Sequence, residues 1–172
     1  MESIINFIIN LFSGLTKSAF GREIVVFIIS MMPILELRGG LLASALLKLN
    51  PVVGYIISII GNIIPVPFIL LFINKILDWM EKSKIKWMNK LAHWVRKKAH
   101  KHKAPIEKYG YLGLILFVGI PLPGTGAWTG CLIASLLDLD RKKSFLCTLL
   151  GVFIASIIMM IISYGILNNL IH

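Results

Sequence analysis

Acidic residues are scarce in this chain of 172 residues, where eight Asp and Glu stand against eighteen Lys and Arg. Cysteine is also scarce: Cys131 and Cys147 both lie in apolar segments, which favours buried thiols over a disulfide. The four histidines form no HExxH pattern and no cluster with cysteine, so no metal site is predicted. GxSxG, a Walker A loop and GxGxxG after a strand are absent. The sequence therefore argues against a soluble enzyme, and no cofactor is expected.

Hydrophobic residues, in contrast, make up 57% of the chain, and the mean hydropathy is +0.84. Soluble domains contain about 45–50%, so we expect an all-α integral membrane protein formed as a single domain over residues 1–172. The N-terminal segment has no basic region before its apolar run, which argues against a cleaved signal peptide. Apolar blocks that approach or exceed the roughly 20 residues of a membrane span cover residues 24–49, 51–77, 110–137 and 144–168.

Two of these blocks contain helix-disrupting residues. Pro33 and the pair Gly39–Gly40 interrupt block 24–49, and Pro121 and Pro123 interrupt block 110–137. The two halves align at a constant offset of 90 residues with nine identities, which predicts an internal repeat of residues 20–78 and 106–168. The matched residues are Phe27, Pro33, Gly40, Leu42, Leu46, Leu47, Leu49, Gly61 and Ile64 with Phe117, Pro123, Gly130, Leu132, Leu136, Leu137, Leu139, Gly151 and Ile154.

Two topologies are compatible with this repeat. If each broken block spans the membrane, the protein has four spans and two parallel repeats. If blocks 24–49 and 110–137 are re-entrant hairpins, only 51–77 and 144–168 cross, and the repeats are inverted. With re-entrant hairpins, fourteen basic residues lie on one side of the membrane and three on the other. With four spans, the numbers are thirteen and four. The positive-inside rule therefore favours the re-entrant topology. Residues 24–36 as a helix would also rise only about 20 Å, less than the ~30 Å hydrocarbon core.

The segment between the halves is strongly basic. Residues 79–108 hold ten Lys and Arg against two Glu, and we expect this segment to be cytoplasmic. Its apolar residues recur on one helical face, which predicts an amphipathic helix over 79–105, ended near Pro105 and bound to anionic headgroups. A solvated helix packed on the protein surface is the alternative, and no nucleic acid is expected. The face comprises Met80, Trp87, Met88, Leu91, Trp94 and Val95.

Glu36 and Arg38 are the candidate functional residues, because charges within hydrocarbon cost about 2.5–3.5 kcal/mol each. Broken elements at matching positions of two halves indicate the midplane site of a transporter. Arg38 suits an anionic group, and Glu36, whose neutral form is favoured away from water, suits a coupling proton. The alternative is a structural pair that fixes the hairpin. Further substrate-binding candidates are Gly39, Gly40, Asn62, Gly124, Thr125, Gly126, Trp128 and Thr129.

The motifs PILELRGG and PLPGTGAWTG, with the spans that follow them, resemble the bacterial and archaeal family of small multidrug export proteins over about residues 20–168. This resemblance implies a location in the plasma membrane of a prokaryote. The hairpins also resemble those of the DedA superfamily. That resemblance implies movement of phosphorylated polyprenyl and other lipids, coupled to protons or sodium. Glu36 and Arg38 would then take the acidic and arginine roles. The second broken block departs from the pattern, since its tip has neither an acidic residue nor an arginine.

We therefore predict a secondary transporter or flippase that moves an anionic or lipid-phosphate substrate with proton or sodium coupling. An exporter of small cationic drugs is one alternative, although a cation site gains nothing from a neighbouring arginine. A membrane scaffold that transports nothing is the other. Because two full spans are few for an enclosed path, we expect a homodimer.

Overall fold

The computed structural model describes residues 2–12, 14, 16, 18–122 and 124–170. Every regular element in these residues is a helix, which agrees with the predicted all-α class. In chain order the helices are α1 (Glu2–Leu11), α2 (Ala19–Met31), α3 (Glu36–Leu46), α4 (Pro51–Ile63), α5 (Pro65–Lys82), α6 (Lys86–His102), α7 (Ala104–Gly119), α8 (Ala127–Leu136) and α9 (Arg141–Leu170).

The first broken block folds as two short helices, α2 and α3. The chain leaves the helix around Pro33, as predicted, and Met32 has extended angles (φ −70°, ψ 135°) because a residue before proline avoids the helical region. The predicted interruption at Gly39–Gly40 is wrong, since both residues lie inside α3. They serve packing instead: a Cβ built on Gly40 would come within 2.9 Å of Ser58 Oγ.

The second broken block has the same order of elements, with α7 and α8 separated at residues 120–126. Ile120, which precedes Pro121, is extended (φ −87°, ψ 119°), again because of the following proline. Pro123, the other break residue predicted here, lies outside the described residues. α7 bends at Gly110, whose φ of 57° falls in the left-handed region that glycine tolerates.

The turns after α3 and α8 match residue by residue at an offset of 90. Lys48 and Asp138 have φ values of 52° and 50°. The next residue in each turn donates its N–H to a carbonyl five positions back over 3.0 Å, from Leu49 to Ser44 and from Leu139 to Ala134. Asn50 then caps α4 by accepting from the N–H of Val52 over 2.9 Å, and Asp140 accepts from the N–H of Lys143 over 2.9 Å at the start of α9.

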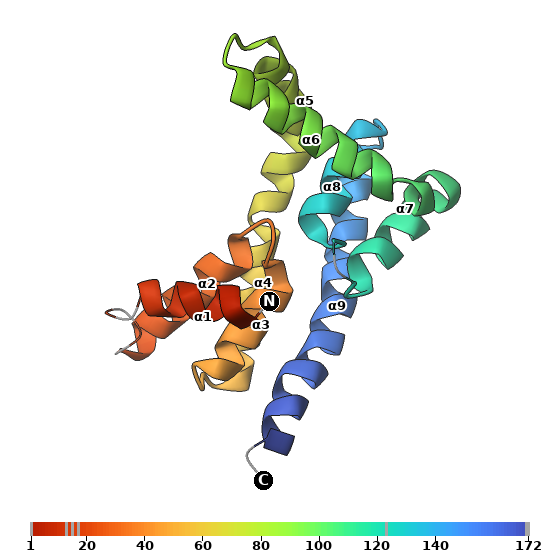
Figure 1. Cartoon of the computed structure of the whole chain (residues 1–172). Helices are drawn as coiled ribbons and strands as arrows, with labels where there is room; N and C mark the ends of the chain where they lie inside the picture. The colour runs from red at the N-terminus through yellow and green to blue at the C-terminus, as the bar shows by residue number, and fades with distance from the viewer. Residues whose placement is uncertain (1, 13, 15, 17, 123, 171–172) are drawn as a thin grey trace.

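Among the residues that the structure describes, two helical segments are long and apolar enough to cross a membrane: Pro51–Lys82, formed by α4 and α5, and Arg141–Gly165 of α9. Their 32 and 25 residues would rise about 48 and 37 Å. The 13 residues of α2, the longest of α2, α3 and α8, would rise only about 20 Å. In Figure 1 the α4–α5 segment rises as α9 descends, so the two long segments run in opposite directions.

The surface of the long segments is apolar. Phe68 on α5 is 61% exposed and Ile161 on α9 is 69% exposed. Buried serines lie on the inner faces of α4 and α9, among them Ser58, Ser144 and Ser156. Large apolar side chains outside and small polar ones inside are the arrangement expected of helices packed together in lipid.

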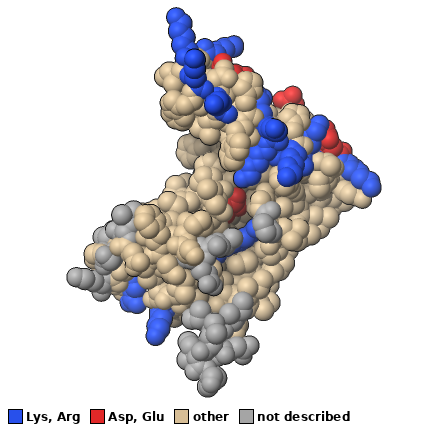
Figure 2. All heavy atoms as spheres, in the orientation of Figure 1, with Lys and Arg blue, Asp and Glu red and all other residues tan. Residues whose placement is uncertain are grey.

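Most Lys and Arg gather at one end of the molecule, around the end of α5, α6 and the start of α7 (Figure 2). α6 begins at Lys86, so the prediction of one helix from residue 79 is wrong, and Met80 belongs to α5. The break falls at Ser83, whose hydroxyl accepts from the N–H of Ile85 over 3.3 Å and so competes with the helical pattern. The helix ends before Pro105, as expected. Trp87 and Trp94, on the predicted apolar face, are 64% and 57% exposed, and their insertion into headgroups stays a prediction.

Candidate functional site

The breaks of the two helix pairs meet inside the protein. We call residues 32–38 the first tip and residues 120–128 the second tip. The two charged side chains of the first tip, Glu36 and Arg38, are only 6% and 8% exposed, and both hydrogen-bond to the second tip. The sequence predicted that these tips come together, and the structure places them in direct contact.

Glu36 binds the N-terminus of α8. Its Oε2 accepts a hydrogen bond from the Ala127 N–H over 2.8 Å, and its Oε1 accepts one from the Trp128 N–H over 3.2 Å. The first N–H groups of a helix have no partner within the helix and carry its positive dipole end. The carboxylate therefore occupies an anion site formed by backbone alone.

Backbone geometry on both tips makes this contact possible. Glu36 has a φ of 51°, a left-handed conformation that is uncommon for a residue with a side chain. Gly126, the residue before α8, has a φ of 142°, and a Cβ built there would fall 2.6 Å from the Glu36 carboxyl carbon. Only glycine fits this position, so Gly126 clears the space for the carboxylate.

Arg38 binds carbonyl groups of the second tip. Its Nη1 donates to the Leu122 carbonyl oxygen, and its Nη2 donates to the carbonyl oxygen and the hydroxyl oxygen of Thr125, each over 2.8 Å. The Thr125 hydroxyl also lies 3.0 Å from the Ile120 carbonyl oxygen, within the same loop. The guanidinium thus fixes the loop in the conformation that presents the first turn of α8 to Glu36.

Glu36 and Arg38 therefore act on the second tip rather than as a local pair. One side chain binds backbone N–H groups and the other binds backbone carbonyls. This arrangement explains why a sequence can keep two buried charges in apolar segments, since both are hydrogen-bonded by protein. In this conformation the terminal nitrogens of Arg38 are engaged and do not face a ligand.

Asn62 lies beside the two charges. It is 1% exposed, and its Oδ1 has no hydrogen-bond partner among the described residues. A cavity of about 10 Å³ touches Asn62, Glu36, Arg38 and Gly126, so four of the predicted site residues are brought together. No group of three or more His, Cys, Asp or Glu in the described chain is arranged to hold a metal ion.

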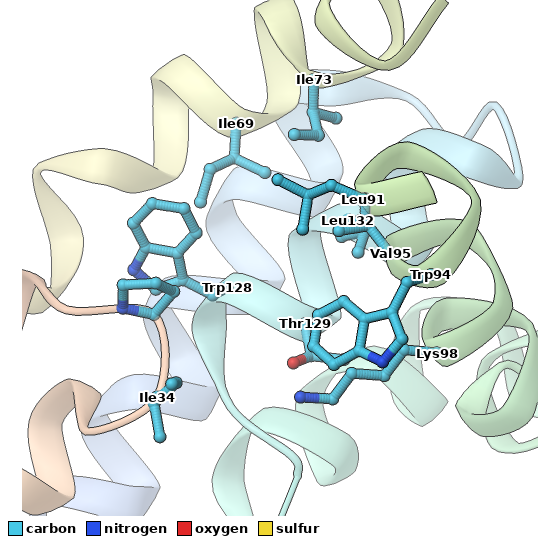
Figure 3. Close-up of a pocket in the computed structure, with 11 residues that line it drawn as sticks. Ile34, Ile69, Ile73, Leu91, Trp94, Val95, Lys98, Trp128, Thr129 and Leu132 are labelled. Carbon is cyan, nitrogen blue, oxygen red and sulfur yellow. The ribbon is translucent and has the colours of Figure 1, made fainter. Parts of the chain in front are cut away.

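Trp128 and Thr129 line a larger pocket of about 310 Å³ (Figure 3). That volume is at the lower end of small-molecule sites. Lys98 is the only charged residue among those that line it in the described chain. The walls come from the first tip, α5, α6 and α8: Pro33, Ile34, Ile69, Ile73, Leu91, Trp94, Val95, Lys98, Trp128, Thr129 and Leu132.

Within the pocket, Lys98 runs along the Trp94 ring towards Thr129 (Figure 3), with its Nζ 5.2 Å from the ring centroid. The Trp128 ring lies across the pocket, and its buried Nε1 has no partner among the described residues. Sequence reasoning missed Lys98 and assigned Trp94 only to the lipid interface. Their spacing of four residues on a basic helix was the available signal, but one lysine among ten gives no reason to single it out.

Trp128 joins the pocket to the tip contact. Its backbone N–H binds Glu36, and its side chain forms a pocket wall. The remaining predicted candidates do not line this pocket. Gly39 packs against Ile29, from which a built Cβ would lie 3.2 Å, and Gly124 adopts a φ of 85° in the loop.

The apolar exterior, the two long spans and the charges enclosed at the tips define a small helical membrane protein. A family model described as "Putative small multi-drug export protein" matches residues 36–158, more than two thirds of the chain. The chain belongs to this family, whose name assigns it a role in membrane transport, as the sequence motifs indicated. No curated protein and no solved structure matches it.

Proposed function

We propose that the protein is a proton-coupled membrane transporter for amphipathic anions of the lipid-phosphate class. The observation that supports this proposal best is the position of Trp128. Its N–H binds the Glu36 carboxylate, while its side chain forms a wall of the pocket that contains Lys98. One residue thus connects the group that can take up a proton with the site that can take up substrate.

The chemistry of the pocket favours an anion with an apolar tail. Lys98 supplies a cation, the Thr129 hydroxyl supplies a donor, and the remaining walls are apolar. A phosphate monoester would accept from both groups, and its chain would lie against Ile69 and Ile73. This assigns the anionic group to Lys98 and leaves Arg38 to hold the second tip.

Coupling follows from the hydrogen bonds of Glu36. A carboxylate accepts strongly from the two N–H groups at the start of α8, whereas the protonated acid accepts weakly and loses its attraction to the helix dipole. Protonation would therefore release the first turn of α8 and with it the Trp128 wall. Substrate bound at that wall would in turn change how easily Glu36 is protonated, because linkage between two sites is reciprocal.

We further propose that α2–α3 and α7–α8 are re-entrant hairpins entering from opposite sides, as inverted repeats. The short helices and the matched turns at Lys48 and Asp138 support this arrangement. The basic end would then be cytoplasmic, with α6 and its exposed tryptophans among anionic headgroups. The homodimer stays a prediction.

The proposal is tested by binding in nanodiscs of zwitterionic lipid, with dodecyl phosphate as the probe. We expect Lys98→Gln to raise the dissociation constant about tenfold, the effect of losing roughly 1.4 kcal/mol of charge interaction. The matched control is Lys97→Gln, because Lys97 is exposed on the same helix and does not line the pocket. That variant should bind within twofold of the original protein.

The second candidate is an exporter of small cationic drugs, and the family description, which names multi-drug export, favours drugs as substrates. It predicts that dodecyltrimethylammonium binds better than dodecyl phosphate and that Lys98→Gln strengthens this binding. Such a result would overturn the anion proposal. If the anion is preferred, flux in proteoliposomes should respond to a pH gradient with the original protein and not with Glu36→Gln.

A further inference from the structure

Buried polar side chains form a row on one side of the tip contact, between α2, α3, α4 and α9. Ser58 and Asn62 lie four residues apart on α4 and so share one face. Ser30 and Ser58 both approach Gly40, and at the far end Ser44 Oγ lies 2.8 Å from the Tyr164 hydroxyl. We call Ser30, Ser44, Ser58, Asn62 and Tyr164 the α4 row.

A second row lies on the other side of the contact, between α5, α8 and α9. Ser144 and Thr148 are four residues apart on α9, and the Thr148 hydroxyl lies 3.4 Å from Cys131 Sγ. Ser135 lies one turn after Cys131 on α8, and its carbonyl oxygen accepts a hydrogen bond from Asn74 Nδ2 over 2.8 Å. We call Asn74, Cys131, Ser135, Ser144 and Thr148 the α9 row.

The α4 row reaches the small cavity at Glu36, and the α9 row ends one helical turn short of it. Asn62 ends the α4 row at the small cavity that Glu36 and Arg38 line, and Val152, one turn after Thr148, lines the same cavity. Away from it, the α4 row leads towards the turn after α3 and the α9 row towards the turn after α8. These turns lie at opposite ends of the molecule (Figure 1). Ser58 and Thr148 also stand 90 positions apart.

Several atoms of both rows are buried without a hydrogen-bond partner in the described chain. They are Ser58 Oγ, Asn62 Oδ1, Asn74 Oδ1, Ser135 Oγ and Ser144 Oγ. Leaving such a group unsatisfied costs about 1–3 kcal/mol, and buried polar groups are otherwise bound by protein or water.

Close packing alone does not account for these residues. Small side chains let membrane helices approach one another, and Gly40 and Gly54 serve that purpose here. Alanine would pack equally well at Ser58 or Ser144 without an unsatisfied oxygen. The polarity, rather than the size, therefore needs an explanation, and the group at the junction is one that binds protons.

We propose that the two rows form a water-containing proton path through the protein, with Glu36 at its centre. The path rests on the proposed function in that it supplies the coupling proton to Glu36. The charged groups that act on Glu36 are Arg38 and Lys98. Water in each row would satisfy the unpartnered oxygens and link Glu36 to one end of the molecule.

The test is thiol labelling, which does not depend on transport. In a Cys131→Ser, Cys147→Ala background in nanodiscs, Ser58→Cys and Ser144→Cys are treated with N-ethylmaleimide, which reacts with thiolates and so requires water. The controls are Ile56→Cys and Leu146→Cys, on the same helices but 49% and 59% exposed on the apolar surface. We expect the row thiols to react at least tenfold faster than the controls. Equal rates would overturn the path.

The native Cys131 gives the same test without a new cysteine, in the Cys147→Ala variant alone. Reaction in the folded protein supports the α9 row, and reaction only after denaturation argues against it. If the row thiols react but no substrate flux is measured, the water path is supported and the proposed transport function is contradicted. If substrate flux is measured but the row thiols do not react, the transport function is supported and the water path is contradicted.

A second measurement addresses the proton. Thr148→Val removes a hydroxyl at nearly constant shape, and substrate-driven proton uptake into proteoliposomes should fall at least tenfold while dodecyl phosphate binding stays unchanged. Unchanged uptake would contradict the path. The control is Ser18→Ala, outside both rows.

Discussion

The two tips that meet at the centre of this protein contribute opposite kinds of groups. The first tip supplies side-chain charges, Glu36 and Arg38, on a short helix. The second tip supplies backbone: the N–H groups of Ala127 and Trp128 and the carbonyls of Leu122 and Thr125. The acidic side chain binds the donors and the basic one binds the acceptors.

This difference explains why the second tip has no charges of its own. Charged side chains in the second tip would need further hydrogen-bond partners of their own, whereas backbone dipoles are present in any loop and any helix end. Two halves with matching turns can therefore hold each other at the centre of the protein with one acid and one base. The predictions below test this division of roles, beginning with the largest expected effect.

Replacing Arg38 should lower the free energy of unfolding the most. Arg38→Ala removes the guanidinium donors to the Thr125 carbonyl and hydroxyl and one of the two donors near the Leu122 carbonyl, so we expect the free energy of unfolding to fall by about 4 kcal/mol. Unfolding by SDS titration, followed by circular dichroism, measures it. Arg38→Lys should recover about half, because an ammonium cannot reproduce the planar fork. A loss below 1 kcal/mol in Arg38→Ala would show that the guanidinium does not hold the second tip.

The glycine before α8 comes next. Gly126→Ala places a Cβ against the Glu36 carboxylate at a φ of 142°, and we expect a loss of about 3 kcal/mol from strain and displacement. Gly165→Ala is the control, since a Cβ there meets nothing within 4 Å and the residue is helical. It should stabilise by up to about 1 kcal/mol in the same titration. Equal changes in the free energy of unfolding for the two variants would contradict the close approach of Gly126 to the Glu36 carboxylate.

Neutralising the acid should have a smaller effect. Glu36→Gln keeps one acceptor oxygen but turns an amide N–H group towards the start of α8, so we expect a loss of about 2 kcal/mol. Glu107→Gln is the control, because Glu107 forms an exposed pair with Lys103. That change should cost less than about 0.5 kcal/mol. If the two variants are equally stable, the α8 N-terminus does not depend on the carboxylate.

The matched turns should respond alike and weakly. Asn50→Ala and Asp140→Ala each remove a side-chain cap from the first turn of a long helix, and each should cost about 1 kcal/mol. Thermal unfolding in detergent measures both, with Asn50→Ser as the variant that keeps a cap. A large loss of stability at one turn and none at the other would show that the two turns are not equivalent.

Much of the fold followed from local sequence signals. The breaks at Pro33 and Pro121 were predicted because proline restricts its own position and the residue before it. Gly39 and Gly40 misled the same reasoning, since glycine signals either a break or a close helix contact and the sequence does not say which. The start of α6 was also missed, because the apolar spacing from Met80 to Trp87 continues across the break at Ser83.

The candidate site was predicted in part. Glu36, Arg38 and Asn62 stood out as polar residues in apolar blocks, and the structure brings them to one cavity. Lys98 and its pocket were not foreseen, because the pocket requires α5, α6 and α8 to meet.

By itself the sequence determined a helical membrane protein with two interrupted blocks, because apolar length, proline position and charge asymmetry are local properties. Only the tertiary structure decided what the buried charges bind. Their partners are N–H and C=O groups about 90 residues away, and every residue possesses such groups whatever its side chain. Partners of this kind leave no mark in a sequence, so their position had to come from the fold.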